Sequence, residues 1–159
     1  MISVHAAVET ILSQISPLSG EEVPILQATG RVLFEDLRAR RSVPPFANSA
    51  MDGYSVRWRD VAQASATNPV TLQVLETVPA GYVAKRRVGE GSAIKIMTGA
   101  PLPRGADTVV RVEYTESVGD HVRISRVDGS GSHIGEAGED IRRGQTILEK
   151  GKVLTPADI

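Results

Sequence analysis

The sequence contains no cysteine, and this absence excludes several kinds of chemistry. Without thiols the chain has no disulfide bond, no thiolate nucleophile and no ligand for a cysteine-based zinc or iron–sulfur site. The three histidines are scattered, and no phosphate-binding P-loop, His-Glu-x-x-His motif or nucleophile elbow is present. Carboxylates and hydroxyls remain, and they suit metal-assisted handling of phosphates and oxyanions better than acyl transfer.

Long hydrophobic runs and a strong net charge are also missing. No stretch approaches the roughly 18 apolar residues that a membrane-spanning helix requires, and the N-terminus lacks the regions of a signal peptide. The net charge of -1 argues against a broad nucleic-acid-binding face, which usually needs a strongly basic domain. We therefore predict a cytoplasmic protein that binds neither nucleic acid nor membrane.

The N-terminal segment has the periodicity of an amphipathic helix. Ser3 can cap it, and its apolar residues recur at three- and four-residue spacing, at Val4, Ala7, Val8, Ile11, Leu12 and Ile15. Such a helix must lay its apolar face on another surface. Weaker patterns predict a short helix near residues 30–33 and one helical turn within residues 57–62.

After residue 70 the pattern changes to short β-prone runs. They lie at 70–74, 93–97, 108–114, 122–124 and 146–148, and glycine and proline turn signals separate them. Short strands at close spacing indicate a small barrel or sandwich and not an α/β sheet. The predicted fold class is mainly β with short helices (α+β), in which an N-terminal amphipathic helix precedes a small, complex β barrel or sandwich.

Residues 43–56 carry the first candidate site, and we call them the signature loop. They read Val-Pro-Pro-Phe-Ala-Asn-Ser-Ala-Met-Asp-Gly-Tyr-Ser-Val, in which two prolines restrict the backbone and two turn signals follow. The loop holds one carboxylate, Asp52, beside a glycine that lets another group approach closely. Asp52 could bind Mg²⁺, accept hydrogen bonds from a substrate or act as a base, or it could simply belong to a turn.

Two later segments offer further polar groups. Thr98 and Gly99 follow an apolar run, so their hydroxyl and amide could donate to an oxyanion at a sheet edge, or they could form a strand-ending turn. The glycine-rich stretch 129–144 contains Glu136, Glu139 and Asp140. Two carboxylates about 5 Å apart repel by roughly 3 kcal/mol at an effective dielectric near 20, so their convergence on Asp52 would need a cation or a raised pKa.

Three motifs together resemble the MoeA/gephyrin family of molybdopterin molybdenumtransferases. They are the signature loop, Ile-Met-Thr-Gly-Ala-Pro-Leu-Pro from Ile96, and Gly-Glu-Asp-Ile from Gly138, in the family's order and rough spacing. The resemblance covers essentially the whole chain. It has two departures: Ala47 stands where the family usually has an acid, and residues 133–136, including Gly135, stand where it tends to show an Asn and an Arg.

The resemblance implies an activity and a set of residues. The reaction is insertion of molybdate into adenylylated molybdopterin, with Mg²⁺ assisting, AMP released and the molybdenum cofactor formed. The implied catalytic residues are Asp52, Thr98 and Asp140, the implied metal ligands are Asp52 and Asp140, and the implied substrate-binding residues are Asn48, Ser49 and Gly99. The choice between Glu136 and Glu139 as an extra ligand stays open.

The resemblance also implies partners and a domain organisation. The family forms homodimers with the active cleft shared between subunits, and molybdopterin adenylyltransferase is the expected upstream partner. Residues 1–42 and 141–159 are expected to form a helical and extended linker subdomain leading into a missing pterin-binding domain, with residues 43–140 as an inserted β-rich subdomain. Because a helix start signal closes the sequence at residues 155–158, we expect a fragment. The shared active cleft that the resemblance implies leads us to expect that this fragment is inactive alone. A non-catalytic scaffold and a regulatory paralogue that binds pterin or molybdate without turnover are the alternatives.

Overall fold

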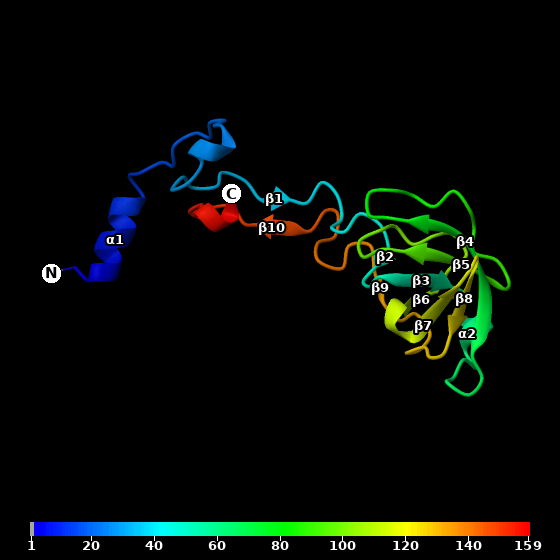
Figure 1. Cartoon of the computed structure of the whole chain (residues 1–159). Helices are drawn as coiled ribbons and strands as arrows, with labels where there is room; N and C mark the ends of the chain where they lie inside the picture. The colour runs from blue at the N-terminus through cyan, green and yellow to red at the C-terminus, as the bar shows by residue number, and fades with distance from the viewer. Residues whose placement is uncertain (1) are drawn as a thin grey trace. The chain divides into compact units, whose positions relative to one another are not determined.

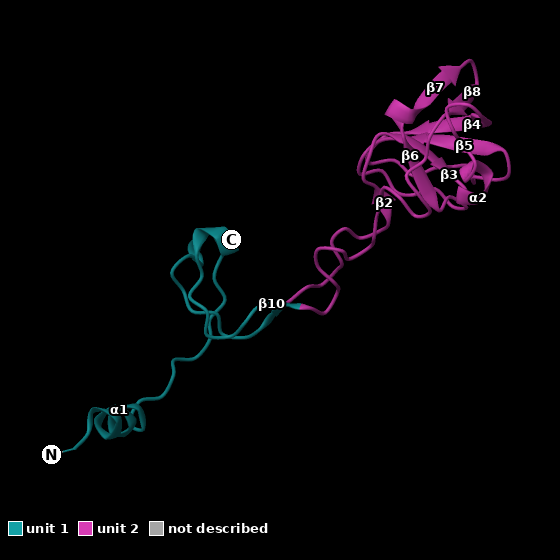
Figure 2. Cartoon of the chain, turned by 90° about the horizontal axis from the view of Figure 1, so that it is seen from below, with its two compact units in different colours: residues 1–37, 146–159 teal, residues 38–145 magenta. Residues whose placement is uncertain are grey.

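The computed structural model describes residues 2–159, which group into two compact units (Figure 2). Unit 1 contains the chain up to Leu37 together with residues 146–159, and unit 2 contains residues 38–145. The predicted fold class is confirmed, since short helices accompany a mainly β structure. The subdomain boundaries predicted after residues 42 and 140 stay a prediction. None of the helices formed by residues 2–159 has the length and apolar character needed to cross a membrane.

Helix α1 (Val4–Leu12) confirms the predicted N-terminal helix (Figure 1). The Ser3 hydroxyl accepts the N–H of Ala6 at 3.2 Å, as a capping residue should. The regular helix stops three residues before Ile15, and the last predicted turn is irregular. No residue of α1 is buried, and Val4 is 83% exposed, so the helix presents its apolar side chains to the surface.

The helix predicted near residues 30–33 is wrong. A 3-10 turn, η1 (Ile25–Gln27), lies earlier, and Gly30 follows it with a φ of 81°. The N–H groups of Gly30 and Leu33 donate to carbonyl groups within residues 152–154, each at 2.8 Å. Pairing with this distant segment takes up the donors that a local helix would have used.

Residues 146–159 of unit 1 contain two short elements. Strand β10 (Thr146–Leu148), predicted from the sequence, pairs with β1 (Leu37–Arg38). A 3-10 turn, η3 (Pro156–Asp158), opens with a capping box formed by Thr155 and Asp158. Hydrogen bonds from Lys152 and then from Thr155 lower the pKa of Asp158 to about 2.

A curled six-stranded sheet organises unit 2 (Figure 1). Its strands, in spatial order, are β6 (Thr108–Arg111), β3 (Gly53–Val56), β5 (Ser92–Ile96), β4 (Val70–Val78), β8 (His121–Ile124) and β7 (Thr115–Val118). The β4–β5 pair is parallel and the other pairs are antiparallel. The turn predicted within residues 57–62 is present as α2 (Trp58–Val61). Strands β3 and β7 were not predicted.

Strands β3 and β5 are buried on both faces of the sheet. Alternate residues of β5 enter two different clusters: Ala93 packs with Tyr54 and Val110, whereas Ile94 and Ile96 pack with apolar residues on the other face. This two-sided burial explains why Ala93, Ile94 and Ile96 are all apolar although neighbouring residues face opposite sides of the sheet. Strands β3 and β5 therefore form a rigid base for the loops at their ends.

Candidate functional site

The pairing of β3 with β5 brings Asp52 and Thr98 together. These strands run antiparallel, with Gly53 opposite Ile96. Asp52 immediately precedes β3, and Thr98 lies two residues after the end of β5. In an antiparallel pair the start of one strand and the end of the other lie at the same edge, so both side chains emerge there.

One oxygen of Asp52 accepts both donors of Thr98. The backbone N–H and the Oγ1 hydroxyl of Thr98 each lie 2.8 Å from Asp52 Oδ1. These two bonds, the amide first and the hydroxyl second, hold the pKa of Asp52 below its ordinary value of 3.8. Asp52 is therefore ionised at neutral pH. Within residues 2–159 no group donates a hydrogen bond to its second oxygen, Oδ2.

The neighbouring donors are used inside the protein. Besides the Thr98 hydroxyl, the Gly99 N–H is engaged, since it donates to Ser49 O at 2.8 Å. The expectation that both groups are free to bind an oxyanion is therefore wrong for this structure. Ser49 is 1% exposed and its hydroxyl donates to Met51 O at 2.5 Å. Substrate binding by Asn48, Ser49 and Gly99 stays a prediction.

A second short strand pair borders the site. Strands β2 (Asn48–Ser49) and β9 (Ile134–Gly135) run antiparallel, with Asn48 opposite Gly135. A Cβ at Gly135 would lie 3.0 Å from Asn48 Oδ1 and 3.4 Å from Glu139 Oε2. Gly135 thus lets the amide and the carboxylate approach one backbone position. Glu139 Oε2 accepts the N–H of Glu136 at 3.3 Å, so the Glu139 carboxylate lies beside this backbone position.

Asp140 is tied to the start of the signature loop by its backbone. Its N–H donates to Val43 O at 3.1 Å, and its side chain is exposed. Nowhere in residues 2–159 does a hydrogen bond join the carboxylates of Asp140 and Asp52 to a shared partner.

The metal site implied by the resemblance is not assembled by this part of the protein. No cluster of three or more His, Asp or Glu side chains in the described chain is placed to hold a metal ion. Asp52 could supply one oxygen ligand, but a complete Mg²⁺ centre needs about six. Metal binding by Asp52 and Asp140 stays a prediction.

Sequence reasoning missed Glu113, which lies close to Asp52. Strand β6 is the other neighbour of β3, and Val112 just beyond it donates its N–H to Asp52 O at 3.0 Å. The pKa of Glu113 is lowered by its own backbone N–H and by Arg111, and the charge of Asp52 opposes this effect. The β-prone run 108–114 includes Glu113, but strand β6 ends at Arg111 and residues 112–114 form a 3-10 turn, η2 (Val112–Tyr114), so the strand prediction is wrong for these three residues.

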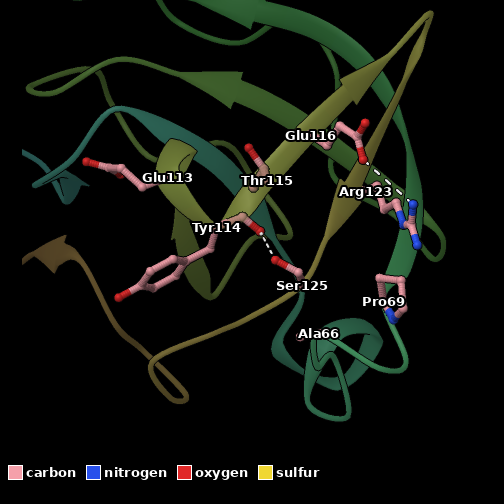
Figure 3. A pocket seen from close by; sticks show the side chains of 8 residues that line it. All are labelled: Ala66, Pro69, Glu113, Tyr114, Thr115, Glu116, Arg123 and Ser125. Atoms are coloured by element: carbon pink, nitrogen blue, oxygen red, sulfur yellow. Dashed lines mark hydrogen bonds and ion pairs between the residues drawn. The ribbon is translucent and has the colours of Figure 1, made fainter.

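Two shallow depressions lie on unit 2. One, of about 210 Å³, lies beside the β7–β8 hairpin, where Figure 3 shows the Glu116–Arg123 pair and the Ser125 hydroxyl directed at the Tyr114 carbonyl. None of the predicted site residues lines it. The other, of about 360 Å³, is lined by Glu136, Glu139 and their neighbours, so it adjoins the candidate site.

Thr98→Val is expected to raise the pKa of Asp52 toward 3.8. Valine keeps the backbone donor and the size of the side chain but loses the hydroxyl bond, which is the second cause of the lowered pKa. Because the folded-state pKa is depressed, Asp52 stabilises the fold above its unfolded pKa, and this contribution is lost as the pH falls through the folded pKa. Carboxyl ¹³C NMR across pH 2–6 measures the change. Thr98→Ser, which keeps the hydroxyl, should leave the pKa low, and equal values in all three proteins would show that the hydroxyl has no influence.

The fold and site define a β-rich unit that presents an ionised carboxylate, held by a threonine, where two buried strands meet. The family model of the MoeA N-terminal region (domain I and II) matches residues 2–159, and the chain belongs to this family. It is 46% identical over 135 residues to molybdopterin molybdenumtransferase 2 of Mycobacterium tuberculosis, covering 85% of this chain and 33% of that protein. It is 40% identical to the molybdopterin molybdenumtransferase of Synechococcus elongatus, covering 98% and 40%.

A solved structure supports the same assignment. The crystal structure of the molybdopterin biosynthesis moeA protein from Pyrococcus horikoshii matches with a TM-score of 0.87 and 41% identity, covering 97% of this chain and 41% of that one. The chain therefore spans 33% to 41% of the length of these relatives.

Proposed function

We propose that this chain is the N-terminal region of a molybdopterin molybdenumtransferase that inserts molybdate into adenylylated molybdopterin, forming the molybdenum cofactor and releasing AMP. The names of the relatives support this proposal. The observation that carries it to particular residues is the Asp52–Thr98 pair, in which an ionised carboxylate has one oxygen fixed and the other available.

The charge of Asp52 limits what it can contact. An ionised carboxylate only accepts hydrogen bonds and repels oxyanions, so Asp52 would not bind molybdate or phosphate oxygens directly. It would instead accept N–H groups of the substrate and so orient the substrate for transfer. Thr98 fixes the direction of the carboxylate, and Asp140 supplies a second acceptor beside the signature loop.

The rest of the enzyme must come from outside this region. We propose a homodimer in which each active cleft combines this region with the pterin-binding domain of the other subunit, so that the region alone is inactive. The exposed apolar side chains of α1, including Val4, Val8, Ile11 and Leu12, support a role in association. The substrate would come from a cytoplasmic adenylyltransferase acting on molybdopterin.

Asp140→Ala in the full-length protein is expected to abolish cofactor synthesis and to leave dimerisation intact. Synthesis is measured as AMP release and cofactor formation in a single turnover, and dimerisation by light scattering after gel filtration. Asp120→Ala is the matched control, because Asp120 is an exposed carboxylate in the β7–β8 turn.

Other outcomes would favour a different function. A wild type that binds pterin or molybdate without releasing AMP would be a regulatory paralogue. A wild type that dimerises but binds neither would be a scaffold. If Asp140→Ala turns over like the wild type, Asp140 has no catalytic role.

A further inference from the structure

His133 has an unusual backbone conformation. Among residues 2–159 it is the one non-glycine residue with a positive φ, at 59°. Residues other than glycine rarely adopt this left-handed backbone conformation, although histidine tolerates it better than most. The surrounding contacts must therefore hold His133 in place.

The backbone of His133 supports the signature loop. Its carbonyl accepts the N–H of Ala50 at 2.9 Å, and the next residue, Ile134, pairs with Ser49. Ala50 lies two residues before Asp52. The conformation of His133 therefore determines where the segment that carries Asp52 is attached.

The side chain of His133 is held by a carboxylate. Its Nε2 lies 2.7 Å from Asp128 Oδ2, and both side chains are mostly buried, at 19% and 26% exposure. Asp128 also pairs with Arg126 at 3.4 Å. The hydrogen bond with His133 is the main cause that lowers the pKa of Asp128, and the charges of Arg126 and Arg111 lower it further. These are the charged groups that face the imidazole through Asp128.

The two residues before His133, Gly131 and Ser132, are hydrogen-bonded to the sheet. Ser132 O accepts the N–H of Val109 at 3.1 Å, and the Gly131 N–H donates to Thr108 Oγ1 at 3.2 Å. Both partners belong to β6, the neighbour of β3. The loop thus has fixed attachments to the strand on one side and to the signature loop on the other.

We propose that His133 is a positioning residue of the candidate site: the bond between its side chain and Asp128 keeps its backbone left-handed, so that its carbonyl holds Ala50 and thereby the Asp52 carboxylate in register with Thr98. The catalytic consequence rests on the proposed function. The structural claim rests on the contacts alone and is tested without substrate.

The test compares variants of the 159-residue chain by NMR. His133→Val forces a β-branched residue into a left-handed position, whereas His133→Gly permits that conformation without the side chain. Asp128→Ala removes the carboxylate that binds the His133 side chain. The readouts are hydrogen exchange of the Ala50 amide and the pKa of Asp52 by carboxyl titration. His121→Val is the matched control, because His121 also pairs with a carboxylate, Asp120, at 2.7 Å but has an ordinary extended backbone.

In all three variants the Ala50 amide is expected to exchange at least about tenfold faster than in the wild type. The increase should be smaller in His133→Gly than in His133→Val. The pKa of Asp52 should rise in the same variants and stay low in His121→Val. If His133→Val does not fold, His133→Gly and Asp128→Ala decide the matter. Unchanged Ala50 exchange and an unchanged Asp52 pKa in the folded variants would overturn the proposal and leave the proposed function untouched. If the NMR changes occur but the full-length wild type has no transferase activity, only the proposed function is rejected.

Discussion

Gly53→Ala is expected to lower the free energy of unfolding by about 3 kcal/mol or more, because it forces two buried strands apart. A Cβ at Gly53 would lie 2.0 Å from Val110 O and 2.9 Å from Val110 C, both backbone atoms of β6. No rotamer change relieves a clash with backbone, so β3 must shift. Since β3 also pairs with β5, that shift would disturb the Asp52–Thr98 contact as well.

Urea denaturation of the chain, followed by the fluorescence of its one tryptophan, Trp58, measures this effect. Gly89→Ala is the matched control, because a Cβ there would meet only Ser92 Oγ at 3.8 Å. The control should change stability by less than about 1 kcal/mol. Equal stability of Gly53→Ala and Gly89→Ala would mean that the close approach of β3 and β6 is not needed.

Asp52→Asn is expected to slow cofactor formation by the full-length protein at least about a hundredfold, which corresponds to about 2.7 kcal/mol of barrier. Asparagine can keep an oxygen where Asp52 Oδ1 accepts the two Thr98 donors. It loses the negative charge and replaces the available second oxygen with an N–H donor. The change therefore removes the proposed chemistry of the site with little change in its shape.

Single-turnover mixing of adenylylated molybdopterin, molybdate and Mg²⁺ with the full-length protein measures the rate. Asp120→Asn, which changes another exposed carboxylate outside the site, should match the wild type. If Asp52→Asn forms the cofactor at the wild-type rate, Asp52 is a turn residue with no part in the reaction.

Local signals in the sequence predicted the parts of the fold that depend on local physics. Ser3 caps α1, and residues 93–96 of the run 93–97 lie in the buried strand β5. Gly53 was expected to permit a close approach, and the nearness of Val110 O confirms it. These features follow from periodicity, capping and glycine geometry, which act over a few residues.

Features that depend on distant pairing could not be predicted. Asp52 and Thr98 are 46 positions apart, and their contact requires the register of β3 with β5. Asp52-Gly53 reads as a turn, and only the neighbouring strands make Gly53 the start of β3. The prediction of a helix at residues 30–33 was wrong for the same reason, since the N–H groups of Gly30 and Leu33 donate to a segment more than 100 residues away.

A double-mutant cycle in the full-length enzyme examines whether Asp52 and Thr98 act as one unit. Single-turnover rates are compared for the wild type, Asp52→Asn, Thr98→Val and the double variant. If Thr98 acts through the carboxylate that it orients, Thr98→Val alone slows the reaction, but the double variant is no slower than Asp52→Asn. If Asp52→Asn reacts at the wild-type rate, or the two losses multiply in the double variant, the Asp52–Thr98 pair is not the unit on which the reaction depends.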